Sequence, residues 1–252
     1  MHQKEVFFLN RQNEKLAGVL HLPDKKTKKA AIVCHGFGSS KNALWIPKLC
    51  SMLAKSGFNA LRFDFAGNGC SEGDFCESNC EKEKQDLKFA IKFMKKQGCS
   101  EIITIGHSMG GTVVLMNAVV DRKISAVIAI AAAIHTKKVE NRLLTKNEKN
   151  ELHKTGKVRI HLINRHYVLK KSFFDSFEKQ KVLKGVHKIK APILLIHGSD
   201  DHTIPVEESK SAKKEAPRLK LTVIEGGNHT LMKGKSAEIL IESIITWLKQ
   251  NF

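Results

Sequence analysis

The stretch IITIGHSMGG, residues 102–111, joins an apolar and mostly β-branched run to a turn of the form G-x-S-x-G. A helical pattern follows from Thr112, so the stretch predicts a strand, a sharp turn and a helix, with Ser108 at the apex of the turn. The backbone of a residue at such an apex is strained, and its side chain is lifted off the sheet. Gly106 and Gly110 leave room for the close crossing of strand and helix. In this context the serine is typical of an exposed nucleophile.

Apolar strand patterns and amphipathic helix patterns alternate on both sides of this stretch. The pattern predicts an α/β fold with a mostly parallel, eight-stranded sheet covered by helices on both faces. The expected strands cover residues 5–10, 15–22, 30–34, 59–65, 102–105, 126–132, 192–197 and 219–225, and the expected helices include 44–55, 84–96, 205–216 and 236–249.

Residues 135–190 interrupt this alternation because they are polar, basic and weakly periodic. They contain 16 Lys and Arg residues against 5 Asp and Glu residues, which places +11 of the formal net charge of +18 in this segment. The active site of such a sheet lies at the carboxyl ends of the strands, and the segment begins at one of these ends. We therefore predict an inserted lid at 135–190, with 1–134 and 191–252 forming the core.

A serine hydroxyl becomes an effective nucleophile when a base, usually a histidine oriented by a carboxylate, removes its proton. In this arrangement of strands the chain order is serine, then acid, then histidine. His229 follows the strand at 219–225, which makes it the candidate base. Asp201 follows the strand at 192–197 and is the candidate acid, with its neighbour Asp200 as the alternative. His107 flanks the serine, and we expect its side chain to point away from the hydroxyl and to pack.

Two backbone N–H groups are expected to stabilise an oxyanion beside the serine. One is the N–H of Met109, which directly follows the nucleophile. The other comes from the loop after an early strand, HGFG at residues 35–38, where the N–H of Phe37 is the candidate.

Taken together, the HGF, GHSMGG and GGNH motifs, the Asp201 loop and the stretch RFDFAGNGCS at 62–71 resemble the α/β-hydrolase superfamily. The chain is most similar to the short-lidded cinnamoyl and feruloyl esterases and related serine carboxylesterases. This resemblance implies a lid between the sixth and seventh strands of the fold, with an aromatic acyl group bound beneath it. Tyr167, the only tyrosine, becomes a candidate for holding a phenolic hydroxyl. We interpret Arg62 and Asp64 as an ion pair within a structural turn.

The remaining composition excludes several classes of protein. Hydrophobic residues make up 42% of the 252 residues, as in a folded globular protein. No apolar run approaches membrane-spanning length and no secretion signal is present, so we expect a cytoplasmic protein. Cys70, Cys76 and Cys80 cluster without metal-ligand spacing, and free thiols, no metal and no cofactor are expected.

The high positive charge indicates either a lysine-coated surface or attraction to anionic partners, and no motif for specific nucleic-acid binding accompanies it. A basic lid favours anionic acyl substrates or a lipid surface.

The sequence thus predicts a serine carboxylester hydrolase that acts on a small ester through an acyl-enzyme, with feruloyl or other small acyl groups as substrates. An acylglycerol lipase, a thioesterase and a serine peptidase are alternatives on the same fold. A non-catalytic binding protein on this scaffold is the alternative from another class. No oligomeric state is indicated.

Overall fold

Eight strands form one sheet in the computed structural model of the protein, which describes residues 2–162 and 165–252. The strand order is β1-β2-β4-β3-β5-β6-β9-β10, and the β1–β2 and β2–β4 pairs are antiparallel while the others are parallel. The mixed, mostly parallel sheet that the sequence predicts is confirmed. The strands are β1 (His2–Leu9), β2 (Lys15–Leu22), β3 (Lys29–Cys34), β4 (Asn59–Phe63), β5 (Glu101–His107), β6 (Ala126–Ile130), β9 (Ile193–Gly198) and β10 (Lys220–Ile224).

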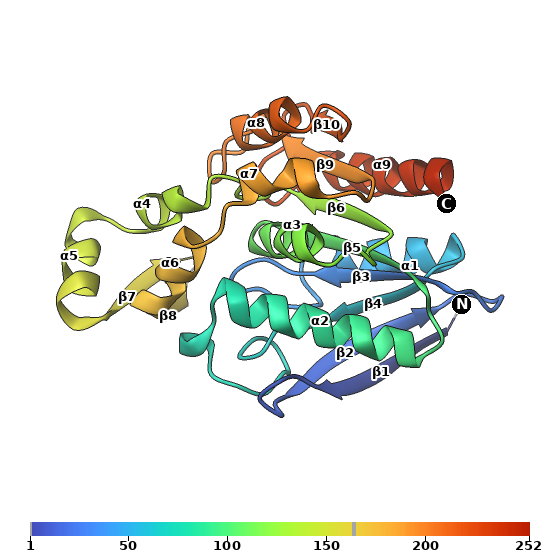
Figure 1. Ribbon diagram of the computed structural model, residues 1–252, viewed down its shortest axis with the longest axis horizontal. Helices are drawn as coiled ribbons and strands as arrows, with labels where there is room; N and C mark the ends of the chain where they lie inside the picture. The colour runs from blue at the N-terminus through green and yellow to red at the C-terminus, as the bar shows by residue number, and fades with distance from the viewer. Residues whose placement is uncertain (1, 163–164) are drawn as a thin grey trace.

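Helices cover both faces of this sheet (Figure 1). On one face, α1 (Ile46–Lys55) and α9 (Ser236–Asn251) bury side chains such as Leu49 and Ile244 against the strands. On the other face, α2 (Cys80–Lys96), α3 (Met109–Val120) and α8 (Glu207–Glu215) belong to a second apolar cluster. Because both faces are covered, the central strands are buried except at the first residues of β3, β4 and β5, which explains their continuous apolar sequences.

Most of the chain between β6 and β9 lies beyond the carboxyl ends of the strands (Figure 1, yellow-green to orange), and its last helix returns to pack beside α3 and α8. The start of this segment is held by Glu208 of α8. Its carboxylate accepts hydrogen bonds from the backbone N–H groups of Ile134 at 2.8 Å and His135 at 2.5 Å. The lid boundaries at 135 and 190 remain a prediction. Its helices and strands are α4 (Val139–Leu143), α5 (Lys146–Thr155), β7 (Lys157–Leu162), β8 (Arg165–Lys170), α6 (Lys171–Glu178) and α7 (Val182–Gly185).

The antiparallel β7–β8 hairpin is an element that the sequence interpretation missed. Val158 and Ile160 of β7 are buried, whereas the alternating Lys157 and Arg159 are exposed. This strict alternation is visible in the sequence and is the signal that identifies a half-buried strand.

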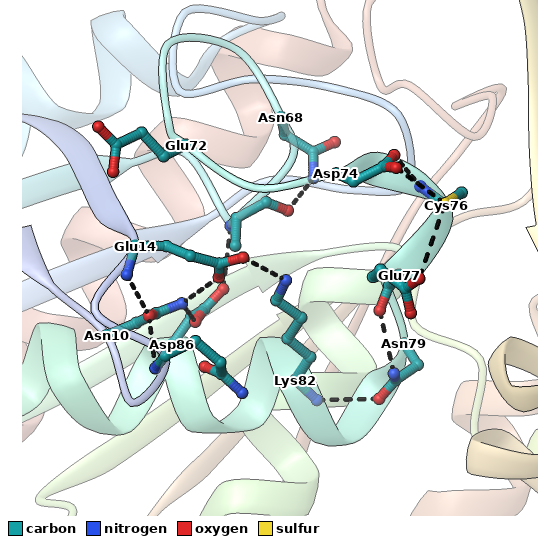
Figure 2. A network of polar contacts seen from close by, with 12 residues as sticks. Asn10, Glu14, Asn68, Glu72, Asp74, Cys76, Glu77, Asn79, Lys82 and Asp86 are labelled. Carbon is teal, nitrogen blue, oxygen red and sulfur yellow. Dashed lines mark hydrogen bonds and ion pairs between the residues drawn. The ribbon is translucent and has the colours of Figure 1, made fainter.

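Buried polar groups tie the β1–β2 turn to α2 (Figure 2). The Asn10 side chain donates to Asp86 Oδ1 at 2.9 Å and to Glu14 Oε2 at 2.7 Å, and Lys82 Nζ lies 2.9 Å from Glu14 Oε1. The Ala66 N–H donates to Asp86 Oδ2 at 2.9 Å. Burial raises the pKa of Asp86 to about 6 because the ionised carboxylate loses hydration. The network anchors the loop after β4 to the helix beneath it.

Candidate active site

Ser108 occupies the sharp turn between β5 and α3. Its backbone adopts φ 53° and ψ −118°, a strained conformation for a residue with a side chain, and its N–H donates to the Ile130 carbonyl at 2.8 Å. A Cβ on Gly106 would lie 2.2 Å from the Gly110 carbonyl oxygen, and one on Gly110 would lie 2.4 Å from the His35 carbonyl oxygen. Side chains at either position are therefore excluded, and the turn presents Ser108 at its apex.

His229 and Asp201 lie in hydrogen-bonding order behind this serine. His229 Nε2 is 3.0 Å from Ser108 Oγ, and His229 Nδ1 is 2.8 Å from Asp201 Oδ2. The three residues follow β5, β9 and β10, whose carboxyl ends share one edge of the sheet. Asp200 instead contacts Ser199 and Lys233, so the structure places Asp201 and not Asp200 against the histidine.

Asp201 is a buried carboxylate with four nitrogen neighbours. Its Oδ1 accepts from the N–H groups of Thr203 at 2.9 Å and Ile204 at 2.8 Å, and its Oδ2 lies 3.2 Å from His197 Nε2 in addition to His229. Burial raises the pKa of this carboxyl, but the hydrogen bonds from His197 and His229 outweigh burial and hold the pKa well below its usual range. The group therefore stays ionised and can orient the imidazole of His229.

The backbone of the His229 loop is held by two side-chain donors that the sequence interpretation did not assign to the site. The indole Nε1–H of Trp45 donates to the Thr230 carbonyl at 3.0 Å, and His107 Nε2 lies 2.9 Å from the His229 carbonyl oxygen. Burial, together with the nearby His229, lowers the pKa of His107 to about 4. Because His107 is neutral near pH 7, its proton must sit on Nε2 for this bond to form. His107 does pack, as expected, and it also positions the loop.

The loop after β3 lies directly against the nucleophile. A Cβ on Gly36 would lie 3.2 Å from Ser108 Cβ. His35 accepts from the Phe65 N–H at Nε2, 3.1 Å away, so its Nδ1 carries the proton and donates to the Gly36 carbonyl at 2.8 Å. In a trans peptide the Gly36 carbonyl and the Phe37 N–H point in opposite directions, so His35 fixes the orientation of that N–H.

Met109 carries the second N–H that the sequence predicts for the oxyanion position. It is the first residue of α3, where backbone N–H groups lack partners within the helix and the helix dipole favours negative charge. The predicted pair, Phe37 and Met109, thus flanks Ser108 from two different elements.

The predicted ion pair between Arg62 and Asp64 is wrong. Asp64 is fully buried and pairs with Lys41, whose Nζ lies 2.5 Å from Oδ2 and whose N–H lies 2.6 Å from Oδ1. Arg62 Nε donates instead to His21 Nε2 at 3.0 Å. Asp64 also accepts from the Cys70 N–H at 2.9 Å. The carboxylate therefore joins the loop that follows Phe37 to the loop that follows β4.

Four aromatic rings from separate segments meet beside the Phe37 loop. Phe37 lies 5.3 Å from Phe75, 5.2 Å from Tyr167 and 5.5 Å from Phe173 between ring centroids. The Tyr167 hydroxyl donates to the Gly38 carbonyl at 3.3 Å. Tyr167 thus joins the hairpin to the candidate oxyanion loop.

A cavity of about 540 Å³ lies on the outer side of this contact, between β8 and the loops after β3 and β4. Its walls include Gly38, Gly67, Phe75, Arg165 and Tyr167.

The described part of the chain shows neither a metal-binding cluster nor a membrane-spanning helix. In residues 2–162 and 165–252, no group of three His, Cys, Asp or Glu side chains is placed to hold a metal ion. Over the same residues, no helix is both long and apolar enough to cross a membrane. The six cysteines are free thiols, and Cys34, Cys50, Cys80 and Cys99 are buried.

The sheet topology and the strained serine turn are those of the α/β-hydrolase superfamily, and the protein is a serine hydrolase of this fold. Residues 25–176 match the family described as serine aminopeptidase, S33, and the chain belongs to that family.

Several known proteins are similar to the chain over most of its length. Human palmitoyl-protein thioesterase ABHD10, mitochondrial, is 25% identical over 94% of this chain and 78% of the relative. The esterase domain of a Rhodothermus marinus protein is 27% identical, with a TM-score of 0.78 over 99% of both chains. Est1E from Butyrivibrio proteoclasticus, solved with ferulic acid bound, has the same fold with a TM-score of 0.86, 23% identity and 98% coverage of both chains.

Proposed function

We propose that the protein is a serine carboxylic ester hydrolase in which Ser108 is the nucleophile, His229 the general base and Asp201 the orienting acid. The observation that carries the proposal is the unbroken chain of contacts from Ser108 Oγ through both ring nitrogens of His229 to Asp201. A serine with these partners has the geometry required for nucleophilic attack on a carbonyl.

The reaction proceeds in two halves that conserve protons. Ser108 Oγ attacks the ester carbonyl carbon while His229 Nε2 takes the hydroxyl proton, and the tetrahedral intermediate collapses when the imidazolium protonates the departing alcohol. Water then attacks the acyl-serine, again losing its proton to His229, and Ser108 recovers that proton as the acid leaves. Asp201 stays ionised throughout and stabilises the imidazolium.

The N–H groups of Phe37 and Met109 are proposed to stabilise the oxyanion in both halves. The His35 contact that fixes the Gly36–Phe37 peptide and the position of Met109 at the start of α3 support this role. Donors fixed before reaction cost no reorganisation when charge develops, which is why they contribute strongly to rate.

The acyl group is proposed to be small and apolar, with hydroxycinnamoyl groups included. The rings of Phe37, Phe75 and Phe173 beside the candidate oxyanion loop support an aromatic acyl group, and so does the ferulic acid bound to Est1E. Tyr167 donates its proton to Gly38 and keeps a lone pair to accept a phenolic hydroxyl.

A thioester is the second candidate substrate, because human ABHD10 is named as a thioesterase.

An aminopeptidase activity is not favoured by the charge of the lid. The segment 135–190, with 16 basic against 5 acidic residues, repels the protonated amino terminus that an aminopeptidase binds.

Hydrolysis of p-nitrophenyl esters by the wild type and by Ser108→Ala tests the mechanism. We expect the variant to lose about four or more orders of magnitude in kcat, because no other group replaces the nucleophile. An unchanged circular dichroism spectrum shows that the variant is folded. Ranking short, long-chain and hydroxycinnamoyl esters by kcat/KM then defines the acyl group. Full activity of the folded variant would disprove the role of Ser108.

A further inference from the structure

The β7–β8 hairpin presents one apolar face and one cationic face. Residues 158, 160, 167 and 169 face inward, and the outward side is formed by three cross-strand pairs. We call this outward side the cationic hairpin face; its residues are Lys157, Arg159, His161, His166, Val168 and Lys170.

This face lies in a stretch of chain without any acidic residue. Residues 152–174 contain six Lys or Arg, three His and no Asp or Glu. Lys170 pairs with Glu77 of the core. Among the described residues, no carboxylate forms an ion pair with Lys157, Arg159 or Arg165. Unpaired cations that repel one another on a two-stranded sheet are destabilising, so an anionic ligand would stabilise this arrangement.

The hairpin also forms one wall of the 540 Å³ cavity beside the candidate oxyanion loop. Arg165 and His166 line the cavity together with Gly38, which directly follows Phe37. Asp74 on the opposite wall is bonded to the N–H and the thiol of Cys76 at 2.9 and 3.0 Å, as Figure 2 shows. The cavity therefore extends from Gly38, which follows the candidate oxyanion residue Phe37, to the unpaired Arg165 of the hairpin.

The site is thereby divided into an aromatic side and a cationic side. The aromatic rings suit an apolar acyl group. The cations are therefore available to bind the alcohol or thiol that leaves when the ester is cleaved. Lys157 and Arg159 on the outward side of the hairpin and Arg165 at the cavity are more cations than a single carboxylate needs, and arginine matches the geometry of phosphate oxygens. A leaving group that carries several phosphate charges fits this number of cations.

Resting on the proposed ester or thioester hydrolysis, we propose that the cationic hairpin face and Arg165 bind a phosphate-bearing leaving group. Such a face also attracts the substrate from solution, which raises kcat/KM at low ionic strength.

Two thioesters with the same acyl group separate the phosphate contribution from the chemistry. Octanoyl-CoA and octanoyl-N-acetylcysteamine share the scissile bond and the first amide, but only the CoA ester carries phosphates. We expect the wild type to favour octanoyl-CoA by about tenfold or more in kcat/KM at low salt, and added salt to remove the preference. The Lys157→Glu, Arg159→Glu double variant should lose this preference.

The matched control reverses the charge of two exposed lysines at the opposite end of the sheet. Lys25 and Lys26 precede β3 at the amino ends of the parallel strands, so Lys25→Glu, Lys26→Glu changes net charge equally but far from the hairpin. This control should keep the wild-type preference. A preference near one in the wild type, or an equal loss in both double variants, would overturn the proposal.

A second measurement does not depend on thioester cleavage. CoA should inhibit p-nitrophenyl ester hydrolysis at concentrations at least about tenfold lower than pantetheine, which lacks all of the phosphates and the nucleotide. Equal inhibition by the two compounds contradicts phosphate binding. Absence of all ester and thioester hydrolysis by the wild type contradicts the proposed function instead.

Discussion

Two regions lie beyond the carboxyl ends of the strands, but they are attached to the core differently. One is the set of loops that carry Ser108, Asp201 and His229, and the other is the β7–β8 hairpin. Trp45 and His107 hold the His229 loop through buried hydrogen bonds, and backbone N–H groups and two imidazoles surround Asp201. The hairpin contacts the core through ring packing, the Tyr167 hydroxyl and an exposed ion pair between Lys170 and Glu77.

This difference separates two tasks. Geometry for bond cleavage must be exact to a fraction of an ångström, and buried hydrogen bonds supply such positioning. Exposed ion pairs contribute about 0–1 kcal/mol each, so the hairpin can change its surface residues without disturbing the core. Substrate selection is therefore expected to vary with the hairpin while the chemistry stays constant.

Removing the charge of Asp201 is the strongest test of the loops that carry the candidate triad. We expect Asp201→Asn to lower kcat for p-nitrophenyl esters by about 10⁴-fold, because the amide no longer orients the imidazole or stabilises its charged form. Asp200→Asn is the matched control and should keep near-wild-type activity. Equal losses in the two variants would contradict the assignment of Asp201.

The buried network beneath the Ala66 loop makes core stability depend on pH. The pKa of Asp86 is about 6 in the folded protein and near 3.8 in an unfolded chain. Between these values the folded state binds the extra proton, so its free energy of unfolding falls as pH rises, by about 3 kcal/mol in total. Asp86→Asn should remove this part of the fall between pH 4 and pH 7 in urea titrations. Parallel stability curves for variant and wild type would refute the role of Asp86.

Loss of the Trp45 indole donor should have a smaller effect on catalysis. Trp45→Phe keeps most of the ring but frees the Thr230 carbonyl, and one hydrogen bond of about 1 kcal/mol corresponds to a fivefold to tenfold change in kcat. KM should remain constant because Trp45 acts through the His229 loop. The other tryptophan, Trp247 in α9, provides the control Trp247→Phe. A change confined to KM would show that Trp45 does not position His229.

Loss of the hydroxyl contact between Tyr167 and Gly38 should have the smallest effect of these substitutions. We expect Tyr167→Phe to lower the free energy of unfolding by less than about 1 kcal/mol, since the phenyl ring retains its packing on Phe37 and Phe75. Limited proteolysis of the segment 135–190 should accelerate slightly while hydrolysis of p-nitrophenyl acetate persists. A collapse in stability would show that the hairpin is held as firmly as the catalytic loops.

The sequence predicts the sheet and the order of the candidate triad because both depend on local patterns. The G-x-S-x-G turn sets the backbone of Ser108, and strand ends locate Asp201 and His229. Trp45, His197 and the bond from His107 to the His229 loop were missed because their partners are backbone carbonyls or side chains brought close by the fold; Trp45 and Thr230 are 185 residues apart.

The incorrect pairing of Arg62 with Asp64 has a related cause. Side chains two residues apart need not meet, and Lys41 reaches the carboxylate from a loop 23 residues upstream. The hairpin, in contrast, was predictable from the alternation in residues 157–162, which the many charges in the segment concealed.

Gly38 lies where the lid contacts the core, and the close packing of this contact depends on the absence of a Cβ atom at position 38. Its φ is +58°, and an added Cβ would lie 2.6 Å from the Tyr167 hydroxyl oxygen and 2.8 Å from the ring carbon that bears it. A side chain at position 38 would therefore force the Tyr167 ring to move from its place on the core. Exchange of residues 135–190 between related chains, a direct route to new substrate preferences, must therefore treat position 38 as part of the transplanted segment.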